Sequence, residues 1–280
     1  MIHMLCGMLI MLLSYRFAIT LKNNNDYAVV VALLAGAFWM LHPFNVSTTL
    51  YVIQRMAQLA TLFSLAGILC YCYGRAMFNA NRTKALLLMS SGVAVFGLLS
   101  VFSKENGILM VLFILIIEST LFHDLDKPKE LKYWFWIFVY APLAMLFIVF
   151  ASKGFYVNAF HNREFTQLER LLTENRILLD YLHSILIPHL RGNGLINDDI
   201  VLSTGLFTPI TTILAIVVNL VLLGVAIRNR KRHPVLSFSI FWFYGGHVLE
   251  STFTSLELYF EHRNYMPMIG PVFGIMYYIT

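Results

Sequence analysis

Titratable side chains gather in the segment LELYFEHRNYMP, residues 256–267. Glu257, Glu261, His262 and Arg263 fall within seven positions there, directly before another apolar run. Carboxylates bind sugar hydroxyls, and an imidazole can carry a proton near neutral pH. The same residue types are equally typical of a solvated turn where a membrane helix ends. The segment therefore predicts either one wall of a reaction site or a polar helix end.

A helix continuing through this segment would carry an acidic stripe. Glu250, Thr254, Glu257 and Glu261 have the spacing i, i+4, i+7 and i+11, which places them on one helical face. Three carboxylates on one face repel each other, so the stripe requires a cation, a metal or a hydroxyl-rich substrate opposite it. The candidate cations are Arg263, Arg55 and Lys104.

A second group of polar side chains lies within the apolar run 46–73. Tyr51, Gln54, Arg55 and Gln58 have the spacing i, i+3, i+4 and i+7, which predicts one face of a helix. An Arg facing lipid near mid-span costs at least about 2.5–3.5 kcal/mol, so this face should point into the bundle or a wet cavity. A guanidinium suits a phosphate or pyrophosphate because it donates two parallel hydrogen bonds. The alternatives are a snorkelling Arg or a buried structural network.

Two further loops add charged groups. Lys104 and Glu105 lie in Ser-Lys-Glu-Asn, residues 103–106, between two apolar runs, which predicts a tight connection that is either solvated or part of a site. Asp198 and Asp199 follow the glycine-containing stretch after Pro188. This pair is compatible with a helix cap, a metal-ligand pair or a substrate contact, of which the cap is the simplest.

The elements that must position these groups are membrane helices. The 280-residue chain is 59% hydrophobic and only 12% charged, with mean hydropathy +0.71. Backbone polar groups in hydrocarbon must be satisfied within the chain, and the apolar runs are too long and too unalternating for barrel strands. We expect an all-α polytopic bundle of about eight to nine spans forming one transmembrane domain, residues 1–280. The expected spans are 2–21, 27–41, 46–73, 85–102, 107–122, 134–152, 207–227, 235–249 and a ninth beginning at 267.

Loop charges predict the sidedness of these spans. Every second loop is rich in Lys and Arg, which is typical of the cytoplasmic side, so the +5 net charge reports topology and no nucleic-acid partner is expected. The intervening loops then face the periplasm of a bacterial inner membrane, or the lumen in a eukaryote. These outer loops contain His42-Pro43-Phe44, 103–106, 153–206 and 250–266.

The long outer loop, 153–206, predicts an amphipathic helix on the membrane surface that ends at Pro188. Its apolar residues recur at helical spacing with charges between them: Phe165, Leu168, Leu172, Leu179, Leu182 and Leu186. The simplest role for this helix is an interfacial strut.

Four segments in order resemble one family. They are LHPFNVSTTLYVIQRMAQLATLFSLAGILCYCYGR (41–75), SKENGILM (103–110), LLTENRILLDYLHSILIPHLRGNGLINDDI (171–200) and ESTFTSLELYFEHRNYMP (250–267). Together they resemble the protein O-mannosyltransferase-like, GT-C type membrane glycosyltransferases, in the bacterial group usually associated with tetratricopeptide repeats. The resemblance implies an enzyme that passes a sugar from a polyprenyl-phosphate carrier in the membrane to a protein or glycan acceptor on the outer side.

The resemblance also implies a donor site, and the chain departs from the family in two respects. Residues His42, Gln54, Arg55, Lys104, Glu105, Glu257, Glu261, His262 and Arg263 would bind the lipid-linked sugar. The family's first span and first outer loop, which carries the acid usually regarded as the catalytic base, have no counterpart in this chain, and the repeats have none either. The chain therefore looks fragment-like at both ends, and activity as it stands is in question. The catalytic candidates within it are Asp198, Asp199, Glu261 and His262.

Other function classes make different predictions. An O-antigen ligase or polymerase would rely on His189 and Arg191, a transporter would place charged pairs near mid-bilayer, and an envelope scaffold would need no site at all. Cys6, Cys70 and Cys72 lie in apolar runs and indicate neither a disulfide nor a metal site. A divalent metal requirement of the transfer reaction stays open.

Overall fold

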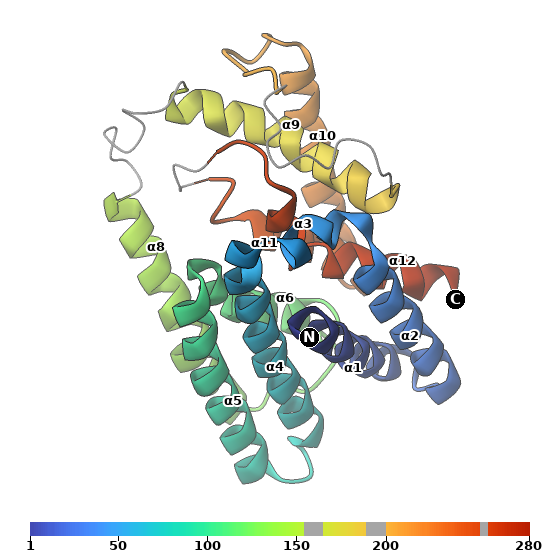
Figure 1. The fold of residues 1–280 in the computed structure, drawn as a ribbon. Coiled ribbons are helices and arrows are strands. Elements are labelled where there is room, and N and C mark those ends of the chain that lie inside the picture. Colours follow the sequence, from blue (N-terminus) through green and yellow to red (C-terminus); the bar gives the residue numbers. More distant parts are fainter. Residues whose placement is uncertain (154–164, 189–199, 253–256) are drawn as a thin grey trace.

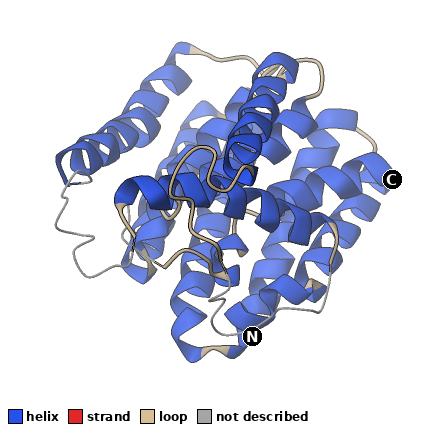
Figure 2. Ribbon diagram, turned by 90° about the horizontal axis from the view of Figure 1, so that it is seen from above, coloured by secondary structure: helices blue, strands red, loops and turns tan. Residues whose placement is uncertain are grey.

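The computed structural model describes residues 1–153, 165–188, 200–252 and 257–280, and within these ranges every regular element is helical (Figure 1, Figure 2). The expected all-α class is confirmed. The helices of seven residues or more are α1 (Ile2–Lys22), α2 (Asn25–Leu41), α4 (Arg55–Met77), α5 (Arg82–Ser103), α6 (Met110–Ser119), α7 (Lys129–Phe135), α8 (Ala141–Lys153), α9 (Gln167–Leu186), α10 (Thr211–Asn229), α11 (Pro234–His247) and α12 (Ile269–Ile279). Shorter turns are η1 (Pro43–Asn45), α3 (Val46–Leu50), η2 (Val52–Gln54), η3 (Glu105–Leu109), η4 (Trp136–Tyr140) and η6 (Glu261–Asn264).

Five stretches are long and apolar enough to cross a membrane, or six if one bent pair counts as a span. The five are α1, Val52–Met77, α5, Lys129–Val149 and α10, and the bent pair joins α2 to Pro43–Leu50 at 54°. The expected count of eight to nine is not confirmed, because several expected spans are shorter helices. The stretch 107–122, for example, contains a 3₁₀ turn and then α6, which has only 10 residues.

The bundle is centred on α1 and an aromatic core. Figure 1 shows α4 and α5 running side by side, with α1 and α2 next to them. Phe17 of α1 contacts Phe238 of α11 and Phe273 of α12 edge-on, at 5.4 and 5.5 Å between ring centroids. Phe113 of α6 stacks on Trp242 of α11 at 4.1 Å. Burial of these rings joins N-terminal and C-terminal elements into one unit.

The expected amphipathic helix is confirmed as α9, which lies across one end of the bundle (Figure 1). It begins with a reciprocal capping box between Thr166 and Glu169 and ends before Pro188, as its sequence dictates. Its orientation is less expected, because Leu168 and Leu186 are exposed. The buried face is largely polar and comprises Arg170, Thr173, Glu174, Ile177, Tyr181, Ser184 and Ile185.

Two predicted helical stripes are wrong. The chain breaks at Tyr51 and α4 begins only at Arg55, so the 51–58 set does not share one helix face. In the C-terminal region α11 ends at His247, so Glu250 and Glu261 do not belong to one helix. The rest of the proposed acidic stripe includes Thr254, which lies outside the described residues.

Candidate functional site at one rim of the bundle

Five charged side chains from four distant segments meet where α9 crosses the bundle. We call this group the rim cluster: Lys104, Arg170, Glu174, Glu250 and Arg263. Lys104 Nζ lies 2.5 Å from Glu250 Oε1, and Arg263 Nε lies 3.8 Å from Glu250 Oε2. Glu174 Oε1 accepts from Arg170 at 3.0 Å and from Arg263 at 3.3 Å. The cluster therefore holds three cations and two carboxylates among the described residues.

Tight packing of the 103–107 turn aims Lys104 at this cluster. Helix α5 stops at Ser103, and Lys104 takes an extended backbone with φ −159° before η3 begins. Gly107 then lies against α5, where a Cβ atom would come within 2.3 Å of the carbonyl carbon of Ser100. Only glycine permits this approach, so Gly107 fixes the turn that presents Lys104.

The 257–265 segment is held by backbone hydrogen bonds as well as charges. Arg263 Nη1 donates to the Leu258 carbonyl at 2.9 Å, and its Nη2 donates to the Glu257 carbonyl. The Tyr181 hydroxyl of α9 donates to the Phe260 carbonyl at 3.1 Å and accepts from the Phe260 N–H at 2.8 Å. Arg263 is thus a cation of the rim cluster, and it also holds residues 257 and 258 of its own loop through their carbonyl groups.

The balance between burial and neighbouring cations shifts the pKa values of the two carboxylates in opposite directions. Desolvation raises the pKa of Glu174 above its usual value despite the guanidinium groups of Arg263 and Arg170. Burial also opposes ionisation of Glu250, but Lys104 and Arg263 outweigh it, so the pKa of Glu250 lies below its usual value. Glu250 therefore carries its negative charge at neutral pH. Partial protonation of Glu174 would increase the net positive charge of the rim cluster.

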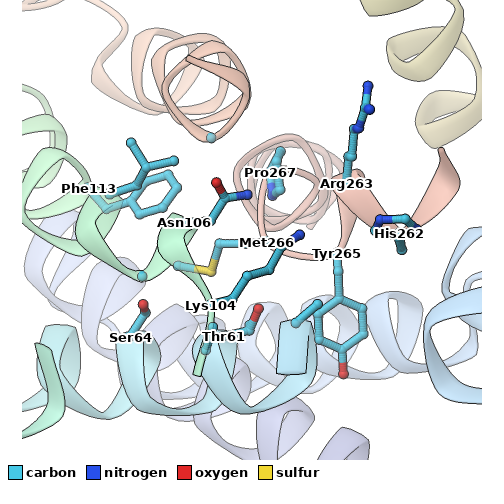
Figure 3. A pocket seen from close by; sticks show the side chains of 15 residues that line it. Thr61, Ser64, Lys104, Asn106, Phe113, His262, Arg263, Tyr265, Met266 and Pro267 are labelled. Carbon is cyan, nitrogen blue, oxygen red and sulfur yellow. The ribbon is translucent and has the colours of Figure 1, made fainter. Parts of the chain in front are cut away.

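A small cavity of about 40 Å³ adjoins the cluster on its bundle side (Figure 3). Its walls come from α4, the Lys104–Leu109 turn, and the segment from His262 to Pro267. Figure 3 shows the Lys104 side chain reaching across toward the Arg263 segment, while the guanidinium of Arg263 points away from Thr61 and Ser64. In this conformation the cavity has room for a water molecule or two.

Of the two predicted proton-transfer groups, Glu261 precedes His262 in the chain, and His262 lies at this cavity. His262 lines it, and burial together with the positive charge of Lys104 lowers the pKa of His262 to about 4. Burial raises the pKa of Glu261, moderated by the Ser47 hydroxyl. At neutral pH, His262 is a neutral imidazole that can accept a hydrogen bond or a proton. A carboxyl with a raised pKa is better matched to proton transfer near neutral pH than an ordinary one.

Other predicted site residues lie elsewhere. His42 is buried, and its Nδ1 accepts from the Phe44 N–H at 3.2 Å, which leaves Nε2 to donate to the Ile185 carbonyl at 3.2 Å. Nε2 thus ties the end of α2 to α9, while Nδ1 caps the turn that follows α2. Arg55 and Glu105 are exposed, and neither makes a hydrogen bond or ion pair with the described parts of the chain. Gln54 does not line the cavity.

The remaining predicted residues are only partly placed. Glu257 is exposed and enters the site through its carbonyl, which accepts from Arg263. The candidates Asp198 and Asp199, and His189 and Arg191 of the alternative hypothesis, lie outside the described residues. Within the described ranges, no group of three or more His, Cys, Asp or Glu side chains is arranged to hold a metal ion.

Sequence reasoning missed Arg170 and Glu174. Their i, i+4 spacing is the usual pattern of a solvated helix pair, yet both side chains are buried, at 0% and 2% exposure. The sequence offers little signal for this, because only Leu168 and Leu186 of the apolar residues of α9 are exposed, while Leu178 and Leu182 pack against the core.

Comparison of the chain with protein-family models, with curated proteins and with solved structures yields no match.

Proposed function

We propose that this protein is a GT-C-like membrane glycosyltransferase that binds a polyprenyl-phosphate sugar at the rim cluster and transfers the sugar to a protein or glycan acceptor. The observation that carries the proposal is the excess of cations over carboxylates, among the described residues, beside the cavity. Among the residues that the structure describes, three cations face two carboxylates, and two of these cations, Lys104 and Arg263, also line the cavity. A buried surplus of positive charge favours binding of an anion.

The family resemblance of residues 103–110 and 250–267 supports the same site. These two segments, more than 140 positions apart, lie against each other through the Lys104–Glu250 pair. The resemblance assigned donor contacts to Lys104 and to the 257–265 segment, and both line or flank the cavity. We therefore assign the phosphate contact to Lys104, supported by Arg263, in preference to Arg55.

The transfer requires one bond exchange and one proton transfer. An acceptor hydroxyl oxygen bonds to the anomeric carbon while the bond from that carbon to the phosphate oxygen breaks, so charge accumulates on the departing polyprenyl phosphate. Lys104 stabilises that charge electrostatically, in exchange for part of its contact with Glu250. The acceptor proton passes to a base, for which Glu261 and His262 are the candidates among the described residues. Because the cavity admits only water, donor binding requires the His262–Met266 segment to move outward.

The proposed setting is a bacterial inner membrane with the rim cluster on the periplasmic side. In this arrangement the shorter apolar helices α6, α11 and α12 complete a bundle of eight to nine spans, since short helices can end at a protein-lined cavity. Leu168 and Leu186 of α9 then face lipid.

Equilibrium binding of a radiolabelled polyprenyl-phosphate hexose to the purified protein in nanodiscs tests the proposal. Lys104→Gln should weaken binding about ten- to hundredfold, the range expected for one charge-assisted hydrogen bond. Lys104→Arg should recover part of that loss. Arg55→Gln is the matched control, because it removes an exposed cation of the same rim without touching the cluster, and it should change binding less than threefold.

A melting curve for each variant separates lost binding from lost folding. Equal affinities for Lys104→Gln and the parent, with both proteins folded, would refute the assignment. A loss confined to Arg55→Gln would move the site to the α4 N-terminus.

A further inference from the structure

A second and larger cavity, which shares no lining residue with the first, lies between the C-terminal half of α6 and the helix that runs from α7 into α8. We call it the lateral pocket; its volume is about 670 Å³, within the usual range of about 300–1,000 Å³ for small-molecule sites. Its apolar walls include Phe135, Trp136, Tyr140 and Ala144, and its polar lining includes Lys127 and Lys132.

The lateral pocket belongs to a lipid-facing flank. In the candidate span Lys129–Val149, only 17% of the most apolar window is buried within the protein. Trp136 is 66% exposed and contacts Tyr140 edge-on at 5.2 Å. The π-helical turn Trp136–Tyr140 widens the helix at this level, as such turns often do at functional sites. Aromatic side chains at this depth suit the boundary between headgroups and acyl chains.

The charge of the lateral pocket is positive. Lys127 and Lys132 are exposed and make no ion pair with the described residues. The one lining carboxylate, Glu118, is already bound by Arg75 and Tyr71. Of the nearby carboxylates, Glu130 pairs with Arg82 and Asp124 with His123, whereas Asp126 is exposed and does not line the pocket.

We propose that the lateral pocket is a binding site for an anionic phospholipid of the adjacent leaflet. Lys127 and Lys132 bind the headgroup phosphate, and an acyl chain lies against Phe135, Trp136 and Ala144. Free phosphate has no apolar group that could contact the apolar wall, so this wall favours a lipid over free phosphate. The two lysines distinguish it from a zwitterionic lipid, since each lysine near an anionic surface contributes about fivefold in affinity.

Native mass spectrometry of the full chain released from nanodiscs of phosphatidylglycerol and phosphatidylcholine tests this proposal. The parent protein should retain phosphatidylglycerol in preference to phosphatidylcholine, and Lys127→Gln/Lys132→Gln should reduce that retention by roughly tenfold or more. Lys84→Gln is the matched control, because Lys84 is an exposed lysine of the neighbouring α5 start that does not line the pocket. It should leave retention unchanged.

A second variant fills the pocket and keeps its charge. Ala144→Trp should lower phosphatidylglycerol retention with both lysines intact, and millimolar inorganic phosphate should not displace the lipid from the parent. Unchanged retention in the double-Gln variant, or an equal loss in Lys84→Gln, would overturn the proposal. Donor binding at Lys104 is independent of these outcomes, so either proposal can fail alone.

Discussion

Two groups of buried charges in the described part of the chain differ in how their charges balance. Near the C-terminal end of α4, Arg75 binds Glu118 of α6 through Nε and Nη2, at 3.0 to 3.3 Å, and the Tyr71 hydroxyl donates to the same carboxylate at 2.5 Å. One cation thus faces one anion, and both oxygens of the Glu118 carboxylate accept hydrogen bonds from Arg75. The rim cluster has three cations for two carboxylates.

Their supports differ as well. Arg75 and Glu118 project from α4 and α6, so their pair fixes two helices of the bundle. Lys104, Glu250 and Arg263 stand on turns, and only α9 contributes from within a helix. The charge-balanced Arg75–Glu118 pair, held on two helices, is suited to stabilising the bundle. The rim cluster has an excess of cations on turns, so one of its contacts can be exchanged for a contact with a bound anion.

The largest expected effect falls on the balanced pair. Glu118→Ala leaves Arg75 buried without its counter-ion and should destabilise the fold by about 3–5 kcal/mol. Denaturant unfolding in detergent measures this loss. The double variant Arg75→Met/Glu118→Leu should recover most of it, and failure to recover would show that the tie depends on more than charge.

Gly107→Val should have the next largest effect. The added side chain meets the Ser100 backbone and should cost about 3 kcal/mol through forced displacement of η3. Since that displacement moves Lys104, donor binding should fall together with the melting temperature. Gly224→Ala is the matched control, because nothing lies within 4 Å of its Cβ position. A stable Gly107→Val variant would disprove the close-approach argument.

The pH dependence of stability should report His262. Its pKa is about 4 in the folded protein against 6.5 ordinarily, so the unfolded chain binds the proton more tightly between these values. Through His262, stability should therefore fall as pH drops from 6.5 to 4, by on the order of 2 kcal/mol, and His262→Gln should make that fall shallower. The lowered pKa of Glu250 adds a separate loss below its ordinary 4.5, present in both proteins. An identical profile from pH 6.5 to 4.5 in the two proteins would contradict burial of His262.

The smallest effect should come from the exposed ion pair between Arg82 of α5 and Glu130 of α7. Arg82 and Glu130 are 2.9 Å apart, but their side chains are 61% and 44% exposed. Arg82→Gln should change the free energy of unfolding by less than about 1 kcal/mol. A larger loss would mean that the α5 start and α7 are tied more firmly than an exposed pair allows.

Periodicity and composition predicted the helical class, the surface helix α9 and the meeting of the 103–106 and 257–265 loops. These features depend on apolar runs, on caps and on loop charge, which are local in the sequence. The helix break at Tyr51 was missed because neither a proline nor a glycine marks that position. The end of α11 at His247 was missed although Gly245 and Gly246 directly precede it.

Tertiary contacts determined the rest of the site. The burial of Arg170 and Glu174 depends on how α9 packs on the bundle, with its polar face buried and Leu168 and Leu186 exposed. The predicted stripe around Arg55 required one continuous helix, which the break at Tyr51 rules out. Nothing adjacent in the sequence identifies Glu250 as the partner of Lys104.

Photo-crosslinking tests the central claim, phosphate binding at the rim cluster, most directly. A polyprenyl-phosphate sugar carrying a diazirine on the isoprenoid unit next to the phosphate would be irradiated with the protein in nanodiscs, and the labelled peptides mapped by mass spectrometry. The account predicts labels on residues 104–109 and 262–267 that disappear with Lys104→Gln and persist with Lys127→Gln/Lys132→Gln. Labels confined to residues 127–144, or labels unaffected by Lys104→Gln, would contradict it.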